Sequence, residues 1–217
     1  SELTTYLSKT EHKQLAIVRF ESVFSEQISK TLNGIELSNK KPSILAETYK
    51  QIGNNDYKTI ILKLKKAGVD MVFLDMVATD PLTFINQARQ LSFSPKIITH
   101  AGIEGPLSMK GVDTSIFDGV IVLNWNASSD AFMSKFEAKY KLTPTNSANR
   151  AYDAVYLLSM AIVDAKSDKA GIVSALESET FNTPNGPFKF TPEHAAGNTL
   201  VQIVEIKGGK YVPWSVK

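Results

Sequence analysis

A set of polar and aromatic side chains stands at the ends of successive apolar runs, where such groups could hold a small ligand. The set comprises Glu21, Ser22, Phe24, Asp75, Met76, Thr79, His100, Gly102 and Trp125. Carboxylates, hydroxyls and an imidazole can orient a ligand by hydrogen bonds, and aromatic rings can bury its apolar part. Structural roles remain open for several of them: Asp75 could cap its own loop, Phe24 could pack on a sheet, and Trp125 could fill a junction between lobes.

Residue patterns that carry out reactions are absent from the sequence. The three histidines, His12, His100 and His194, have no second ligand at the spacing of a metal site, and there is no cysteine. No GxGxxG follows the first apolar run, and no Walker A or GxSxG motif occurs. We therefore expect a binding protein without a metal or a cofactor, and not an enzyme.

The elements that would position these side chains alternate along the first part of the chain. Short apolar runs typical of buried strands lie at 14–20, 42–49, 69–76, 96–99 and 119–125. Helical spacing of apolar residues follows at 25–37, from Asp56 as a cap to Gly68, and from Asp80 onwards. This alternation predicts an α/β fold with a doubly wound parallel sheet. Ligands of such sheets bind at the carboxyl ends of the strands, where the side chains named above are expected.

The pattern changes after about residue 126. Three helical stretches are expected between residues 128 and 179, with Asp168 capping the third, and no strand is evident there. The chain ends in a predicted hairpin, 199–206 with 210–214, turning at Gly208-Gly209. We predict that residues 1–126 with 199–217 form one α/β lobe, and that 127–198 is a helical segment belonging to a second lobe.

Composition and charge exclude several other classes of protein. Of 217 residues, 24 are Lys or Arg and 22 are Asp or Glu, so the net charge is +2 and a nucleic-acid partner is not expected. No run approaches the roughly 18 apolar residues of a membrane span. The absence of cysteine is compatible with an exported protein. The start at Ser1-Glu2-Leu3 suggests a processed or trimmed chain.

Read together, several stretches resemble the type I periplasmic solute-binding proteins, and most closely their Leu/Ile/Val-binding branch. They include LAIVRFESVFSEQISKTL, NNDYKTIILKLKKAGVDMVFLDM, FDGVIVLNW and the segment FEAKYKLTPTNSANRAYDAVYLLSMAI. The most specific is 151–155 (AYDAV), preceded by Pro144, and through it the resemblance adds Tyr152 to the ligand-binding candidates. The resemblance covers the later part of such proteins, so the sheet of the first lobe is not expected in this sequence.

The resemblance implies a substrate-binding component of an ABC-type importer, exported to the periplasm or the extracellular space, with a membrane permease as partner. The ligand would be an amino acid or a similar small polar solute, trapped by hinge closure near 126–130 and 197–199. Two departures from the family's pattern weaken the expectation that the ligand is a branched-chain amino acid. Phe24-Ser25 stands where amino-acid binders often have an aromatic residue followed by glycine, and the uncharged Ala101 lies near the position of an ammonium-binding carboxylate.

Two other functions remain open at this point. A sensory ectodomain of the same fold would signal to a partner protein without feeding transport. An enzyme on a flavodoxin-like sheet would need catalytic groups that we do not find in the sequence, and only turnover that is lost on replacing Asp75 or His100 would support it.

Overall fold

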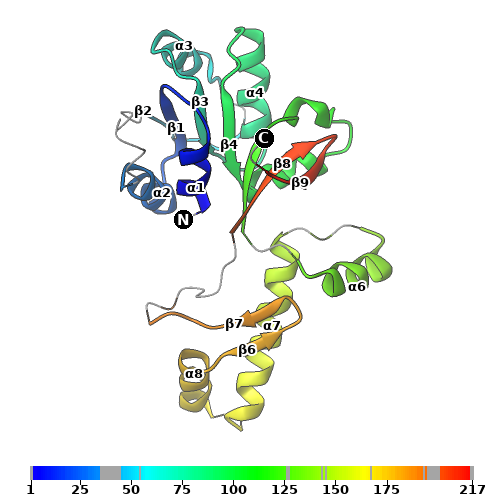
Figure 1. The fold of residues 1–217 in the computed structure, drawn as a ribbon. Coiled ribbons are helices and arrows are strands. Elements are labelled where there is room, and N and C mark those ends of the chain that lie inside the picture. Colours follow the sequence, from blue (N-terminus) through cyan, green and yellow to red (C-terminus); the bar gives the residue numbers. More distant parts are fainter. Residues whose placement is uncertain are drawn as a thin grey trace. The chain divides into compact units, whose positions relative to one another are not determined.

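The computed structural model describes residues 2–34, 45–53, 55–125, 128–142, 144, 146–166, 168–192, 194 and 201–215. The chain divides into two compact units (Figure 1). Unit 1 comprises Ser1–Asn124 and Gln202–Lys217, and unit 2 comprises Trp125–Val201. The assignment of residues 127–198 to a second lobe stays a prediction.

A seven-stranded sheet in the order β2-β1-β3-β4-β5-β8-β9 forms the centre of unit 1. Its strands are β1 (Leu15–Phe20), β2 (Leu45–Tyr49), β3 (Met71–Asp75), β4 (Lys96–His100), β5 (Ile121–Trp125), β8 (Val201–Lys207) and β9 (Lys210–Pro213). Strands β1 to β5 pair in parallel, and β8 pairs with β9 as an antiparallel hairpin. The predicted α/β class with a doubly wound parallel sheet is confirmed, and both residues of the Gly208-Gly209 turn have positive φ.

Helices alternate with the parallel strands, as Figure 1 shows. They are α1 (Glu2–Lys9), α2 (Val23–Gly34), α3 (Lys58–Lys66), α4 (Asp80–Gln90) and α5 (Glu104–Ser108), with short 3₁₀ turns η1 (Ala101–Ile103) and η2 (Thr114–Phe117). The chain moves from β1 to β2 in one direction across the sheet, and through α3 and α4 in the other. Because parallel crossovers are right-handed, α2 lies on one face of the sheet and α3 and α4 lie on the opposite face.

Most residues of β1, β3 and β4 are buried on both faces of the sheet, which explains their continuous apolar runs, whereas β2 is partly exposed. Val18, Val72 and Leu74 pack in one core cluster with residues of α3 and α4. The alternate positions Ile17 and Phe73 point to the other face, and each is 1% exposed or less.

The first helix, α1, was not predicted from the sequence, although Leu3, Tyr6 and Leu7 have helical spacing. All three are buried. The ring of Tyr6 lies 4.8 Å from the ring of Trp214, so the two ends of the chain meet within unit 1. Burial, helped by the charge of Glu205, raises the pKa of Tyr6 to about 12.

Unit 2 is mostly helical, as predicted. Its elements are α6 (Asp130–Tyr140), α7 (Asn146–Asp164), α8 (Lys169–Ser178), β6 (Phe181–Thr183) and β7 (Gly186–Phe188). Leu157, Ala161, Ala175 and Phe181 form its small core. The β6–β7 hairpin was not predicted, because each strand has only three residues and a Pro-Asn-Gly turn between them reads as a loop.

Of the two helix caps predicted from the sequence, one is confirmed and the other is wrong. Asp168 caps α8, accepting a hydrogen bond of 2.7 Å from the backbone N–H of Gly171, as expected. Asp56 does not occupy the cap position of α3, which is Tyr57. The Asp56 carboxylate accepts the N–H of Lys58 at 3.0 Å from one residue further out.

Asp70 links the start of β1 to the start of β3 by hydrogen bonds. Its carboxylate accepts the backbone N–H of Lys13 at 2.8 Å and that of Gln14 at 2.9 Å. Burial by itself would raise the pKa of Asp70, but the hydrogen bonds from Gln14 and Lys13 outweigh it and lower the pKa below its ordinary value. The charged form is therefore the one that stabilises the fold.

We expect Asp70→Ala to lower the free energy of unfolding by about 1–2 kcal/mol at pH 7, since it removes hydrogen bonds to a charged group near the surface. Because the folded-state pKa is depressed, this contribution is complete above about pH 4 and disappears as the pH falls further. Urea denaturation of both proteins between pH 7 and pH 3 measures the difference. A difference that stays constant over this range would contradict the assignment.

Candidate functional site

Asp75 and His100 form a buried pair at the carboxyl edge of the unit 1 sheet, by which we mean the ends of β1 to β5 and the loops that follow them. Nε2 of His100 lies 2.9 Å from Oδ1 of Asp75, and the two side chains are 5% and 4% exposed. Nδ1 of His100 accepts the backbone N–H of Gly102 at 3.0 Å. Because Nδ1 is an acceptor, the proton of a neutral imidazole lies on Nε2 and is donated to Asp75.

Gly102 is required by the tight packing behind this pair. A Cβ atom at this position would collide with the carbonyl oxygen of Met76 and would lie 2.7 Å from Cε1 of His100. Gly102 thus lies at this edge and its N–H holds the imidazole of His100, while its role in ligand binding stays a prediction.

Other predicted residues are spread along the same edge. Glu21 is exposed and lies 3.5 Å from Nζ of Lys50 in an ion pair. The hydroxyl of Ser22 accepts the N–H of Ser25 at 3.1 Å, which caps the start of α2. Thr79 precedes α4 without a side-chain capping bond. The side chain of Met76 is fully buried in the core, so it does not face a ligand from this edge.

Some predicted positions lie elsewhere or outside the described part of the structure. Tyr152 belongs to α7 of unit 2, where its ring contacts Phe132 at 5.4 Å. The side chains of Phe24 and Trp125 are outside the described residues. The same holds for most of the predicted hinge positions, namely 126, 127 and 197–199.

Arg19 is the residue of this edge that the sequence reasoning missed. It is the penultimate residue of β1, and its Cα is in register with that of Asp75 on β3. Its Nε and Nη1 atoms are buried and have no hydrogen-bond partner. An arginine inside the otherwise apolar run QLAIVRF is the signal that could have identified it, because a charge is rarely placed in a buried strand.

A second buried carboxylate, Asp80, has a structural role beside the site. It accepts the N–H of Gly53 at 3.0 Å and lies 3.3 Å from Nδ2 of Asn55, which ties the β2–α3 loop to the start of α4. Burial, followed by the negative charge of Asp80, raises the pKa of Tyr49 well above its ordinary value. Asp80 thus keeps the loops of this edge in place.

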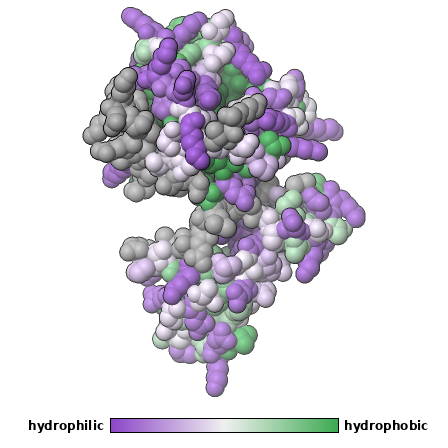
Figure 2. All heavy atoms as spheres, in the orientation of Figure 1, coloured by the Kyte–Doolittle hydropathy of each residue, from purple (hydrophilic) through white to green (hydrophobic). Residues whose placement is uncertain are grey.

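Apolar side chains are exposed along the carboxyl edge beside these polar groups. Val23 after β1, Ile52 after β2 and Val77 after β3 are all exposed, and Val23 is 84% exposed. Figure 2 shows that most of the visible surface of unit 1 is hydrophilic. An edge with buried polar groups and exposed apolar ones suits a ligand with both kinds of group.

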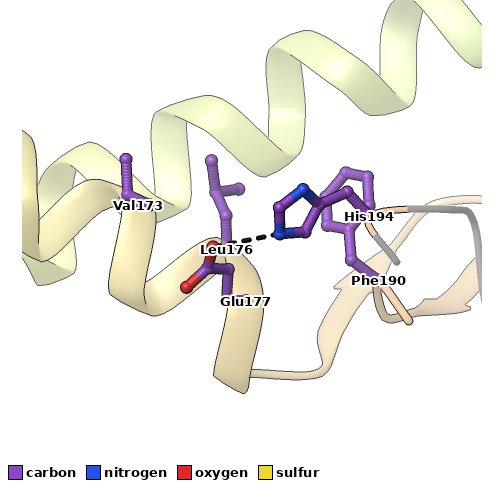
Figure 3. A pocket seen from close by; sticks show the side chains of 5 residues that line it. All are labelled: Val173, Leu176, Glu177, Phe190 and His194. Atoms are coloured by element: carbon purple, nitrogen blue, oxygen red, sulfur yellow. Dashed lines mark ion pairs between the residues drawn. The ribbon is translucent and has the colours of Figure 1, made fainter. Parts of the chain in front are cut away.

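Unit 2 carries a separate shallow hollow of about 240 Å³. Figure 3 shows Val173, Leu176 and Phe190 around it, with His194 paired to Glu177 at 3.2 Å. A neighbouring hollow of about 440 Å³ shares Glu177, Phe190 and His194. Both side chains of the ion pair are exposed, and exposed pairs contribute little energy. We therefore regard the carboxyl edge of unit 1 as the stronger candidate.

Within the part of the chain that the structure describes, no group of three or more His, Asp or Glu side chains could hold a metal ion. None of the described helices has the length and apolar character to cross a membrane.

Comparison with known proteins relates the chain to one family. The family model described as "Periplasmic binding protein" matches residues 1–210. The Leucine-, isoleucine-, valine-, threonine-, and alanine-binding protein of Pseudomonas aeruginosa is 25% identical over 144 residues, which is 64% of this chain and 38% of that protein.

Two solved structures resemble the fold closely. A solute-binding protein of an ABC transporter from R. palustris, in complex with benzoate, superposes with a TM-score of 0.78 at 20% identity, covering 97% of this chain and 60% of that one. A branched-chain amino acid transporter substrate binding protein from Streptococcus pneumoniae, in complex with isoleucine, gives 0.79 at 20% identity, with 96% and 61% covered. The chain thus spans under two thirds of the length of each of these proteins.

We expect Gly102→Ala to lower the free energy of unfolding by about 1–3 kcal/mol, because the added methyl group displaces backbone and the His100 ring. Gly105→Ala is the matched control. A Cβ at Gly105 meets only the carbonyl oxygen of Ala78 at 3.8 Å, and alanine is favoured in the helix. Chemical denaturation of the three proteins measures the effect, and equal stability of the two variants would contradict this description of the edge.

Proposed function

Because the chain belongs to the periplasmic binding protein family, we propose that it is part of the solute-binding component of an ABC-type importer. Family membership over residues 1–210 is the observation that carries the proposal. The component would be exported to the periplasm or the extracellular space and would deliver its ligand to a membrane permease. Binding, without reaction, is the activity proposed.

We propose that the ligand is an amino acid or a related small organic acid. The ligands named for the similar structures, benzoate and isoleucine, differ in their apolar parts but share a carboxylate. The carboxyl edge of unit 1 supports a ligand of this kind, since it combines the buried pair of Asp75 and His100 with exposed Val23 after β1 and Val77 after β3. Closure of the complete protein over the ligand would stabilise the ligand-bound state.

We also propose that unit 2 belongs to the second lobe of the complete protein. Helix α7 buries Leu157 and Ala161 against α8 and β6, but it leaves a broad apolar face exposed on its other side. That face comprises Tyr152, Val155, Tyr156, Leu158, Ile162 and Val163. An apolar face of this size is typical of a surface that packs against another part of the protein. The occupant proposed is the α/β lobe that similar proteins carry in the part of their chains not matched here.

Ligand binding is tested by thermal unfolding of the protein expressed from its complete coding sequence. We expect the midpoint temperature to rise with a member of a panel of amino acids and aromatic acids. A ligand that binds only the native state, present at 100 times its Kd, stabilises it by about 2.7 kcal/mol. The 217-residue chain alone should show a much smaller shift, because it supplies only one side of the site. No shift of the complete protein with any panel member would contradict the proposal for these ligands.

The assignment of unit 2 is tested with Val155→Glu and Val163→Glu. Their side chains are 71% and 74% exposed in this structure, so the 217-residue chain should change in stability by less than about 0.5 kcal/mol. In the complete protein the same charges would be buried against the other lobe, and a loss of about 1–3 kcal/mol is expected. Ala170→Glu, at an exposed position on α8, is the control. Equal, small effects in both proteins, measured by urea denaturation, would contradict the assignment.

A further inference from the structure

Basic side chains collect at the edge of unit 1 that lies opposite the carboxyl edge. A helix between two parallel strands runs from the carboxyl end of one strand to the start of the next, so helix ends and the loops before strands share this edge. The β8–β9 turn belongs to it as well, because Gly119, just before β5, donates its N–H to Ile206 at 2.9 Å. We call this surface the amino edge; it comprises 9–14, 63–70, 89–96, 118–120 and 207–210.

Hydrogen bonds join segments of the amino edge that are far apart in the sequence. The Asp70 carboxylate accepts the N–H of Lys13 at 2.8 Å, and the Asp70 carbonyl accepts the N–H of Lys96 at 2.8 Å. Nζ of Lys65 lies 2.7 Å from the carbonyl oxygen of Leu91, which joins the ends of α3 and α4. Basic residues that are scattered along the chain are therefore gathered by the fold.

Positive charge exceeds negative charge along the amino edge. Its five segments contain nine lysine or arginine residues and three aspartate or glutamate residues. Lys63 forms an ion pair with Glu47 at 3.2 Å. Lys207 pairs with Glu205 at 3.0 Å, and none of the other seven forms an ion pair with a described residue. All nine side chains are exposed: Lys9, Lys13, Lys63, Lys65, Lys66, Arg89, Lys96, Lys207 and Lys210.

Several acidic side chains of unit 1 lie at the opposite, carboxyl edge. Glu26, Asp80 and Glu104 occupy the first turns of α2, α4 and α5. At the amino edge, by contrast, the Asp118 carboxylate is held by the N–H of Gly208 at 2.8 Å. The charges of unit 1 are thus separated between its two edges.

Helix stability explains only part of this separation. The helix dipole favours a cation in the last turn, which is sufficient for the basic residues at the ends of α1, α3 and α4. It does not account for Lys13 in the loop before β1 or for Lys96 at the first position of β4. Nor does it account for Lys207 and Lys210, on the two sides of the β8–β9 turn. The excess of charge therefore calls for a further explanation.

The composition of the amino edge indicates the kind of partner. Within its described segments no large apolar or aromatic side chain is exposed, whereas Val23, Ile52 and Val77 are exposed at the carboxyl edge. Protein interfaces depend on aromatic and apolar anchors, and lysine is depleted in them. Eight of the nine cations are lysines, which lack the planar fork that arginine offers to an anion of fixed geometry. Such a surface suits many mobile anions better than one bound group.

We propose that the amino edge of unit 1 binds the anionic lipid headgroups of a membrane surface. The choice of a membrane rests on the proposed function, which places the protein beside a membrane permease. Clusters of lysine and arginine are attracted to bilayers that contain anionic lipids, and each residue near the surface adds to the binding. Attachment through the amino edge leaves the carboxyl edge of unit 1 free for a ligand and concentrates the protein where the permease lies.

The test uses the protein from the complete coding sequence and vesicles of defined lipid composition. Co-sedimentation is measured with vesicles of phosphatidylcholine alone and with vesicles that also contain phosphatidylglycerol, so that the two differ in charge. We expect binding to increase with the fraction of phosphatidylglycerol. We also expect added salt to weaken it, because salt screens the attraction between exposed charges.

The triple variant Lys13→Gln, Lys66→Gln and Lys96→Gln removes three exposed cations that are in no ion pair with a described residue. Its affinity for the anionic vesicles should fall on the order of 100-fold, since each lysine near the surface contributes roughly fivefold.

The matched control is Lys50→Gln, Lys58→Gln and Lys135→Gln. It changes the net charge by the same amount at exposed positions outside the amino edge, so it should keep the affinity of wild type. The midpoint of thermal unfolding checks the fold of both variants, and the shift of that midpoint with ligand should be the same in both as in wild type.

The possible failures are distinguishable. Equal binding to both kinds of vesicle, or equal binding by the two triple variants, would overturn the inference. No binding to purified lipid would also overturn it, and an acidic protein surface would then be the partner to examine. A ligand shift without preference for anionic vesicles contradicts only this inference. A preference for anionic vesicles that depends on the three lysines, without any ligand shift, supports the surface and contradicts the proposed solute-binding function.

Discussion

Register in the parallel sheet of unit 1 decides which side chains meet at its carboxyl edge. The pairing of β1 with β3 and of β3 with β4 brings together Arg19, Asp75 and His100, which are widely separated in the sequence. A slip of one residue on β3 would turn Asp75 into the core and bring Met76 to its place. The buried apolar residues before them hold this register, so the polar groups of the edge depend on packing several residues away.

Hydrogen bonds hold the loops around Arg19, Asp75 and His100. Gly102 fixes His100, and Asp80 fixes the β2–α3 loop through Gly53 and Asn55. The edge therefore combines hydrogen-bonded loops with polar atoms of Arg19 and Asp75 whose bonding capacity is incomplete. This combination suits recognition of a ligand, because a site that is already ordered loses little entropy on binding.

Much of the fold could be predicted from the sequence because its signals are local. The continuous apolar run at 69–76 and the spacing of Ile61 and Leu64 reflect burial, and burial dominates element choice. The surroundings of a residue whose neighbours are distant in the sequence could not be predicted in this way. Met76 and Asp75 are neighbours in the sequence, but only the register shows that Met76 lies in the core and that Asp75 lies beside Arg19 and His100. Arg19 was overlooked because it sits within an apolar run, and whether its charge is satisfied depends on strands β2 and β3.

Strands β5 and β8 are neighbours in the sheet but lie far apart in the sequence, so the ribosome makes β5 well before β8. Hydrogen bonds join Gly119 and Val120, just before β5, to Ile206 of β8, but all of unit 2 lies between these strands in the chain. At about 5–20 residues per second, a ribosome needs roughly 4–16 seconds to make the intervening 80 or so residues. During that interval β5 is an unpaired edge of a nascent sheet, open to pairing with another chain. A short delay between the synthesis of β5 and that of β8 therefore limits the time for which this edge is open.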